Sequence, residues 1–547
     1  MWPYLVALSL ATLAWVTFVL FGSYEYWQHT GNGVSEMGST LRNGLFVVVG
    51  VLVVAFAGHW VLRSSRDGVN VASAATPSKI STAAPTVNPS VTGILASDGA
   101  RYVLEVRGLG MAVSGRHQDT LWKQISAKSD NFVSVLSHDA KDYPDSPDRR
   151  ALFAKVDTGA AFEYAAAEAV ERWPLPVIVI GPPKDENSKY RAALDIAYAR
   201  QQAGLGVTLF LWQDDANTDN AGASLERLFQ FFDTHPDVPA ALVFSDDGME
   251  TRFGYKTPGA GAEPTGPYVP PIPNSNVGLL VSRSDRVDRL IRPYAVPGVP
   301  GKINQDDTSL DIIKLWNFYW QHDTSFQDET DAAAGGFNGA MTMKADWWIS
   351  KLPELWKQIT NKGPGDFKPS PYLPVRWTDW QVKEFDDSPL LGYLHRPVNI
   401  RLTDEHGKPL KRADQVKALQ AGWQQAIATL PDGEKPARVF YDTTSDREWV
   451  IPLTQALHGN AQGIELDNVK EGYDIGRRVG NTGVSSALVQ IGLATVAGYE
   501  NGGASATINL ASNGTAGIVM VSPPNATSKA ANVQHRGENP FRFRVPG

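Results

Sequence analysis

Short apolar runs that alternate with helix-like segments are the feature that most constrains the fold of this chain. Residues 176–181 read Pro-Val-Ile-Val-Ile-Gly, a run typical of a strand buried on both faces. A helix-like segment at 190–202 follows, and a strand, a helix and a strand are then expected at 207–212, 224–232 and 241–244. Because strands separated by helices of this length pair in parallel, the pattern predicts an α/β fold.

The same pattern returns more loosely in the last third of the chain. A helix is expected at 414–428, a strand at 437–441, a further helix after Gly483, and two closing strands. The chain is therefore expected to contain two similar α/β halves, at 94–300 and 389–524.

Three stretches, in the same order along the chain, resemble a ketoacyl synthase. Residues 102–125 look like its first strand, Gly-rich turn and first helix, and 220–247 look like the helix that carries its nucleophile and the next strand. The run Gly480-Asn481-Thr482-Gly483, together with 504–510 and 514–521, looks like its C-terminal end. The resemblance implies the thiolase-like fold, in which two α/β halves share a buried centre.

The resemblance also implies positions for a catalytic cysteine, histidine and asparagine. In this sequence they fall on Ala221, on Leu453 within an expected strand at 448–455, and on Asn481, which also suits a turn that caps the next helix. The chain contains no cysteine, and condensation needs a thiolate that carries the acyl group as a thioester. We therefore expect a vestigial pocket, no condensing activity and no cofactor.

Tryptophan is concentrated between the two halves, where 301–388 read as an inserted helical region. Seven of the sixteen tryptophans lie between 311 and 380, and Trp316 and Trp320 share one face of a helix. The cluster fits the core of an inserted subdomain. It also fits a partner-binding surface, because tryptophan is enriched in interface hot spots. The candidate partner-binding residues are Trp316, Trp320, Trp347, Trp348 and Trp356.

The first 66 residues have the pattern of a transmembrane hairpin. Residues 3–22 carry no charge, and 45–62 are interrupted only by His59, so each segment can cross a bilayer. Arg63 and Arg66 follow the second segment, which by the positive-inside tendency places both ends of the hairpin in the cytoplasm. Residues 67–93, rich in Ala, Ser, Thr and Pro, are expected to form a flexible linker.

Composition narrows the class of function. An apolar fraction of 43% and a charged fraction of 20% indicate a globular body. The net charge of −8, without a basic cluster of any size, argues against nucleic acid as a partner. The tail, 525–547, is expected to be mobile.

Taken together, the anchor, the linker, the degenerate ketosynthase-like body and the Trp-rich middle resemble the type VI lipase adapter proteins. The resemblance implies a non-catalytic adapter that binds a phospholipase effector in the cytoplasm and delivers it to the type VI secretion spike. The expected partners are therefore the secreted phospholipase, the spike protein and the bacterial inner membrane. The expected location is that membrane, with the body in the cytoplasm.

Two other functions stay open. Asp214-Asp215 and Asp246-Asp247 each follow an expected parallel strand, where α/β folds place Mg²⁺ or catalytic carboxylates, so a carboxylate- or metal-dependent enzyme is one alternative. A non-catalytic binder of acyl groups or acyl-carrier protein is the other. His395 is expected to be a hydrogen-bonded structural residue, and the ten histidines have no spacing typical of a metal site.

Overall fold

The computed structural model describes residues 102–541, except 129, 131–132, 185–190, 203–207, 215–220, 299–309, 432 and 459–462. The chain divides into the units Met1–Gly93 and Ile94–Gly547, and every described residue belongs to the second unit. The transmembrane helices at 3–22 and 45–62 and the linker at 67–93 lie outside the described residues, so they stay predictions. Within the described ranges, no helix is both long and apolar enough to cross a membrane.

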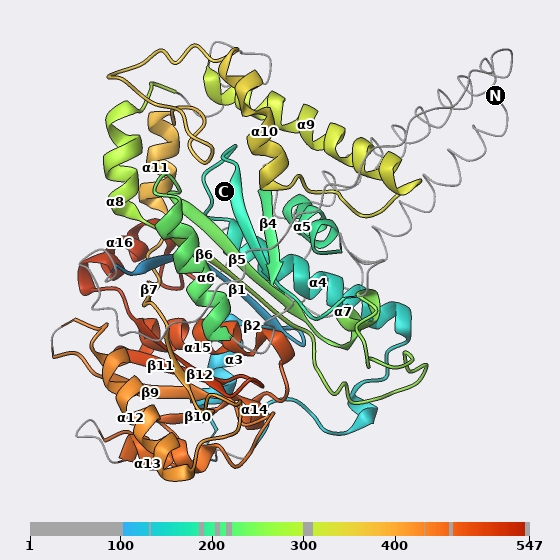
Figure 1. The fold of residues 1–547 in the computed structure, drawn as a ribbon, viewed down its shortest axis with the longest axis vertical. Coiled ribbons are helices and arrows are strands. Elements are labelled where there is room, and N and C mark those ends of the chain that lie inside the picture. Colours follow the sequence, from blue (N-terminus) through green and yellow to red (C-terminus); the bar gives the residue numbers. More distant parts are fainter. Residues whose placement is uncertain are drawn as a thin grey trace, which may run out of the picture. The chain divides into compact units, whose positions relative to one another are not determined.

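A single mixed sheet runs through both halves of the body (Figure 1). In the first half it contains β1 (Leu104–Val113), β3 (Leu175–Ile180), β4 (Thr208–Asp214), β5 (Ala240–Asp247) and β6 (Ser275–Ser282). In the second half it contains β7 (Gly392–Leu394), β9 (Pro436–Tyr441), β10 (Gly472–Asp474), β11 (Ala504–Leu510) and β12 (Thr515–Ser522). Two further strands, β2 (Arg116–His117) and β8 (Val398–Arg401), pair with β1 and β12.

The two halves are an internal repeat. Their strands lie in the orders β4-β3-β5-β6-β1 and β10-β9-β11-β12-β7, which become the same order when each half is numbered along the chain. In both halves the second, third and fourth strands are parallel and the fifth is antiparallel to its two neighbours. Antiparallel pairing of β1 with β7 joins the halves. The expected two-half thiolase-like architecture is thus present in the strand order itself.

Helices cover the sheet according to the same repeat. In the first half, α4 (Pro147–Ala166) and α5 (Arg191–Gln202) pack on one face, while α6 (Ala221–Thr234) packs on the other. In the second half, α12 (Arg412–Ile427) and α13 (Val450–His458) correspond to α4 and α5, and α15 (Ser486–Asn501) corresponds to α6. The side chains of α6, α15 and α3 (Gln118–Ser126) share one apolar core, which is the buried centre of the molecule.

The Trp-rich insertion lies against the edge of this sheet. It contains α9 (Asp311–Ala334), α10 (Ala345–Trp356) and α11 (Asp379–Asp387). The strand β4 ends the sheet order, and Leu209 from it belongs to the same apolar cluster as Tyr319 of α9 and Trp348 of α10. The insertion therefore covers a strand edge that would otherwise be open to pairing.

The expectation of a mobile tail is wrong for the part of the tail that the structure describes. Residues Ala526–Arg536 form α16, in which the side chain of Asn532 exchanges two hydrogen bonds with the backbone of Leu390. Phe541 is buried, and its carbonyl accepts a hydrogen bond from Gln118. The small polar residues of the tail thus cap a helix and fix it to the body.

Candidate functional site

Two positions of the expected vestigial pocket lie on corresponding elements of the repeat. Ala221 begins α6, and Asn481 lies shortly before α15, its counterpart in the repeat. A Cβ atom added to Gly222 would lie 2.1 Å from Oδ1 of Asn399 and 3.1 Å from Cα of Gly517, both in the second half. The start of α6 therefore packs closely against the second half at Gly222.

Asn481 has the role of a turn residue. It is half-buried, and its Oδ1 accepts a hydrogen bond from the backbone N–H of Gly483 at 3.0 Å. Among the residues that the structure describes, neither Leu453 nor Asn481 lines the cavities of about 670, 690 and 500 Å³.

The expected strand at 448–455 is wrong, and with it the reason for assigning Leu453 to the histidine position. These residues lead into α13, and Leu453 is 1% exposed in the core between α13 and α12. Trp449, Leu453, Ala456 and Leu457 are all buried, at the spacing of one helical face. A short apolar run is compatible with either a strand or a helix, and here the buried residues follow the helical period.

The Gly480–Gly483 motif connects the two halves through Asp247. The backbone N–H of Val484 donates to Oδ2 of Asp247 at 2.8 Å, and Ser485 Oγ donates to the carbonyl of Ser275 at 2.6 Å. Gly483 has a φ of +58°, and a Cβ there would lie 1.9 Å from Asp247 Oδ2. Only glycine fits this close approach, which fixes the segment ahead of α15 to the end of β5.

The carboxylates after β5 are held by protein donors. Arg252 binds both oxygens of Asp247, at 2.7 and 2.8 Å, while Thr251 and Asn276 donate to Asp246. Burial raises the pKa of Asp246 to about 7. Among the residues that the structure describes, no group of His, Asp or Glu side chains is arranged to hold a metal ion. The interpretation as a metal-dependent enzyme therefore has no support at Asp246-Asp247. Asp214 ends β4, but its side chain and Asp215 lie outside the residues that the structure describes.

His395 is structural, as expected. Its Nδ1 lies 2.8 Å from the carbonyl of Thr429 and its Nε2 lies 2.8 Å from Ser522 Oγ. Burial lowers the pKa of His395 to about 4, so the ring is neutral at physiological pH. Both nitrogens are engaged, which leaves neither free to act as a base.

The five candidate tryptophans do not form one surface. Trp348 is fully buried in the core of the insertion, so its assignment to the partner-binding set is wrong. Trp356 and Trp347 are partly buried against the same core. Trp347 packs on His322 and Phe326, which belong to the buried stripe of α9, whereas Trp316 and Trp320 lie outside that stripe.

Trp316 and Trp320 form an aromatic pair at the surface, which we call the tryptophan face. Their rings meet edge to face with centroids 5.8 Å apart, and Trp320 is 37% exposed. The guanidinium of Arg200 lies 5.1 Å from the Trp320 ring, and that of Arg172 lies 5.6 Å from the Trp316 ring. Cations at this distance over an indole attract it, so both rings are held in place.

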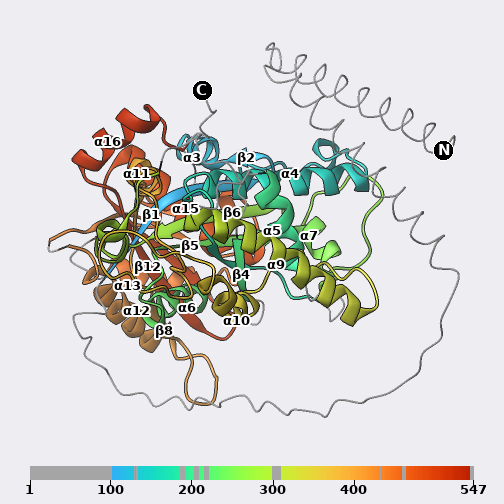
Figure 2. The same ribbon diagram turned by 90° about the horizontal axis from the view of Figure 1, so that it is seen from above.

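Buried polar contacts fix α9 beneath this pair. Arg200 of α5 makes an ion pair with Asp323 of α9 at 2.8 Å, with side-chain exposures of 6% and 1%. The hydroxyl of Tyr319 donates to the carbonyl of Thr208 in β4 at 2.6 Å, and Asp323 also accepts from the backbone of Met343 at 2.8 Å. α9 lies beside α5 in both views (Figure 1 and Figure 2). The sequence pattern does not predict these partners, because Arg200 lies outside the insertion.

Comparison with known proteins places both halves in one family. The family model described as "Type VI lipase adapter protein Tla3, N-terminal" matches residues 102–266, and "Type VI lipase adapter protein Tla3, C-terminal" matches 391–523. Together the matches cover more than half of the chain. The tryptophan face lies between the two matched ranges.

Solved structures of condensing enzymes are similar at low identity. An oxazolomycin ketosynthase domain from Streptomyces albus is 10% identical over 78% of this chain and 96% of its own, with a TM-score of 0.38. The ketosynthase from module 6 of the bacillaene synthase of Bacillus subtilis is 9% identical over 78% and 73%, with a TM-score of 0.39. MvaS in complex with 3-hydroxy-3-methylglutaryl coenzyme A is 13% identical over 79% and 86%, with a TM-score of 0.34.

These TM-scores are below 0.5, so the fold is described by the strand order of the chain itself. The family models match each half of the repeat separately and in chain order. The chain belongs to the type VI lipase adapter family.

Proposed function

We propose that this chain is a non-catalytic adapter that binds a phospholipase effector and delivers it to the type VI secretion spike. The match of both halves to the type VI lipase adapter models carries the proposal. The sequence supports it, because a chain without cysteine cannot perform the thiolate chemistry of the enzymes it resembles.

The tryptophan face is the proposed contact with the effector. Indole groups supply much of the binding free energy in protein interfaces, and here two indoles of α9 are held by guanidinium groups from outside that helix. Trp320 offers an exposed ring, while Trp316 and Arg200 restrict its motion. A side chain that is already held in place loses little conformational entropy on binding, so this pair is suited to act as an anchor.

The exchange of Trp320 for alanine tests this contact. The affinity-tagged full-length chain captures the lipase from cells that produce the secretion system, and bound lipase is quantified by mass spectrometry. We expect Trp320→Ala to reduce capture about tenfold or more, consistent with a hot-spot residue worth about 2 kcal/mol. The double variant Trp316→Ala/Trp320→Ala should reduce it further.

The matched control is Phe337→Ala. Phe337 is 69% exposed in the loop after α9, outside the aromatic pair, so its removal should leave capture unchanged. The melting temperature of each variant distinguishes a lost contact from a lost fold. Equal capture by wild type and Trp320→Ala would mean that the effector binds elsewhere.

We further propose that residues 1–66 anchor the chain in the bacterial inner membrane, with the body in the cytoplasm. The uncharged segments 3–22 and 45–62 and the arginines that follow them support this location. A fluorescent-protein fusion and an alkaline-phosphatase fusion after Gly547 test the topology. Fluorescence without phosphatase activity is expected, and the reverse result would place the body on the other side.

A further inference from the structure

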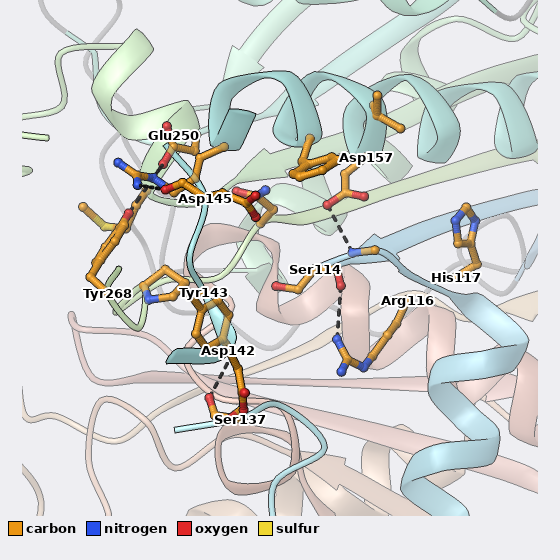
Figure 3. A pocket seen from close by; sticks show the side chains of 17 residues that line it. Ser114, Arg116, His117, Ser137, Asp142, Tyr143, Asp145, Asp157, Glu250 and Tyr268 are labelled. Atoms are coloured by element: carbon orange, nitrogen blue, oxygen red, sulfur yellow. Dashed lines mark hydrogen bonds and ion pairs between the residues drawn. The ribbon is translucent and has the colours of Figure 1, made fainter. Parts of the chain in front are cut away.

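A cavity of ligand size lies on the first half, away from the tryptophan face. Its volume is about 670 Å³, within the range of ordinary binding pockets. The turn between β1 and β2, the segment 137–145, the first half of α4 and the segment 268–274 surround it (Figure 3). None of the candidate site residues singled out in the sequence lines it, because its walls come from five separate segments of the chain, the fifth being Met249 and Glu250.

One wall of the cavity continues into an exposed apolar ridge. Leu152, Phe153 and Val156 of α4 are 55%, 43% and 52% exposed, and the last two line the cavity. Met249 and Pro270 add apolar surface to the wall. Isolated apolar side chains are common on protein surfaces, but three within five residues of one helix beside a cavity are typical of a contact site.

The charged groups of the cavity are unequally available. Arg150 is engaged by Glu250 at 3.0 Å and by the carbonyl of Asp145 at 2.7 Å, and Arg116 donates to Gln124 and to the carbonyl of Ser114. Asp142 also lines the cavity and is exposed to solvent. The mouth thus offers a carboxylate to an incoming group, while its arginines already have acceptors.

A buried hydrogen bond fixes the inner wall of the cavity. Asp157 is 7% exposed and accepts from the backbone N–H of Gly115 at 3.2 Å, which holds the turn at Ser114 and Gly115 against α4 (Figure 3). The wall is therefore formed before any ligand binds.

We propose that this cavity and its ridge bind a protein segment that presents a large apolar side chain next to a lysine or arginine. The apolar group enters between Phe153, Val156 and Met249, where it removes exposed apolar surface from water. The basic group meets the carboxylate of Asp142 at the mouth. An acidic segment would instead face Asp142 with a like charge.

This surface is distinct from the proposed effector contact. The ridge belongs to α4, whereas the tryptophan face belongs to α9, and the two are fixed by different contacts. An adapter needs a second contact besides the one for its cargo, and this cavity has the size and chemistry for one. A substitution that removes binding at one of these surfaces should leave binding at the other unchanged.

A peptide selection tests the inference on the full-length chain in detergent. A phage-displayed library of random 12-residue peptides is selected on wild type, with counter-selection on Phe153→Ser/Val156→Ser. Selected peptides should share an aromatic or long aliphatic residue beside a basic one. Their dissociation constants, measured by fluorescence anisotropy, should rise about tenfold or more in Phe153→Ser/Val156→Ser. In Asp142→Asn they should rise severalfold, by an amount that shrinks at high salt.

The matched control is Val533→Ser, which alters a residue of similar exposure, 48%, on α16. It should bind the peptides as wild type does, and melting temperatures should agree across the variants because all four side chains are exposed. The inference is overturned if no peptide depends on Phe153 and Val156, or if the selected peptides are acidic. It is also overturned if Val533→Ser loses binding to the same degree.

Discussion

Removal of the Asp323 carboxylate should loosen α9 and with it the tryptophan face. In wild type this carboxylate, 1% exposed, pairs with Arg200 at 2.8 Å and accepts from the backbone of Met343 at 2.8 Å. Asp323→Ala leaves a buried guanidinium without its counter-ion, which costs about 3–5 kcal/mol, and also leaves the Met343 N–H unpaired. Because every 1.4 kcal/mol is about tenfold, local opening of α9 should become more than a hundredfold more frequent.

Hydrogen exchange of the amides at 311–334 measures this opening directly. The helix α9 should exchange much faster in Asp323→Ala, while α15 in the central core should change little. The double variant Arg200→Met/Asp323→Leu is the control, because a buried ion pair replaced by apolar side chains is often nearly neutral. It should restore most, but not all, of the protection of α9, because it removes both buried charges but leaves the Met343 N–H unpaired. Unchanged exchange in Asp323→Ala would refute the claim that this pair fixes the helix.

Three further changes test the contacts inside the body. Gly483→Ala should lower the free energy of unfolding by about 3 kcal/mol, because a Cβ at φ +58° strains the backbone and displaces Asp247 from its hydrogen bond with the Val484 N–H. Chemical denaturation measures this loss, and a free energy of unfolding equal to that of wild type would contradict the close approach. Asp246 has a pKa raised by burial to about 7, so the folded state holds a proton that the unfolded state releases, and stability from this group falls as pH rises from about 4 to 7. Asp246→Asn should therefore gain roughly 2–4 kcal/mol relative to wild type between pH 4 and pH 8, and a difference that does not vary with pH would exclude this origin. His395 has a pKa lowered by burial to about 4 and should have the opposite effect. Its contribution to the free energy of unfolding is complete above pH 6.5 and falls by about 3 kcal/mol as the pH drops to 4. Thermal melts of His395→Gln should not show this loss.

Much of the α/β core could be predicted because buried parallel strands have a simple sequence pattern. Residues 176–181 and 241–244 became β3 and β5 with small changes at the ends, since each is a short apolar run that ends at polar or turn residues. The helix α4 was not predicted, because its apolar residues do not follow a clear helical period. Leu152, Phe153 and Val156 add apolar residues to its exposed side, which hides the helical period.

The candidate site was less accessible to sequence reasoning because its contacts are long-range. Val484 and Asp247 are 237 positions apart, and the sequence pattern of either segment contains no information about the other. Trp348 and Trp320 have the same side chain, and only the packing of α9 against α10 and β4 decides which is core and which is surface. Residue type predicted an aromatic region correctly, but exposure required the structure.

Recovery of a lipase with the intact chain tests the adapter proposal most directly. The affinity-tagged full-length chain would be purified from native membranes of cells that produce the secretion system, and the bound proteins would be identified and quantified by mass spectrometry. The proposal predicts a lipase in about a one-to-one ratio with the chain, together with the spike protein in part of the material. Recovery of acyl-carrier protein, or of the chain alone under conditions in which the lipase is present in the cell, would contradict it.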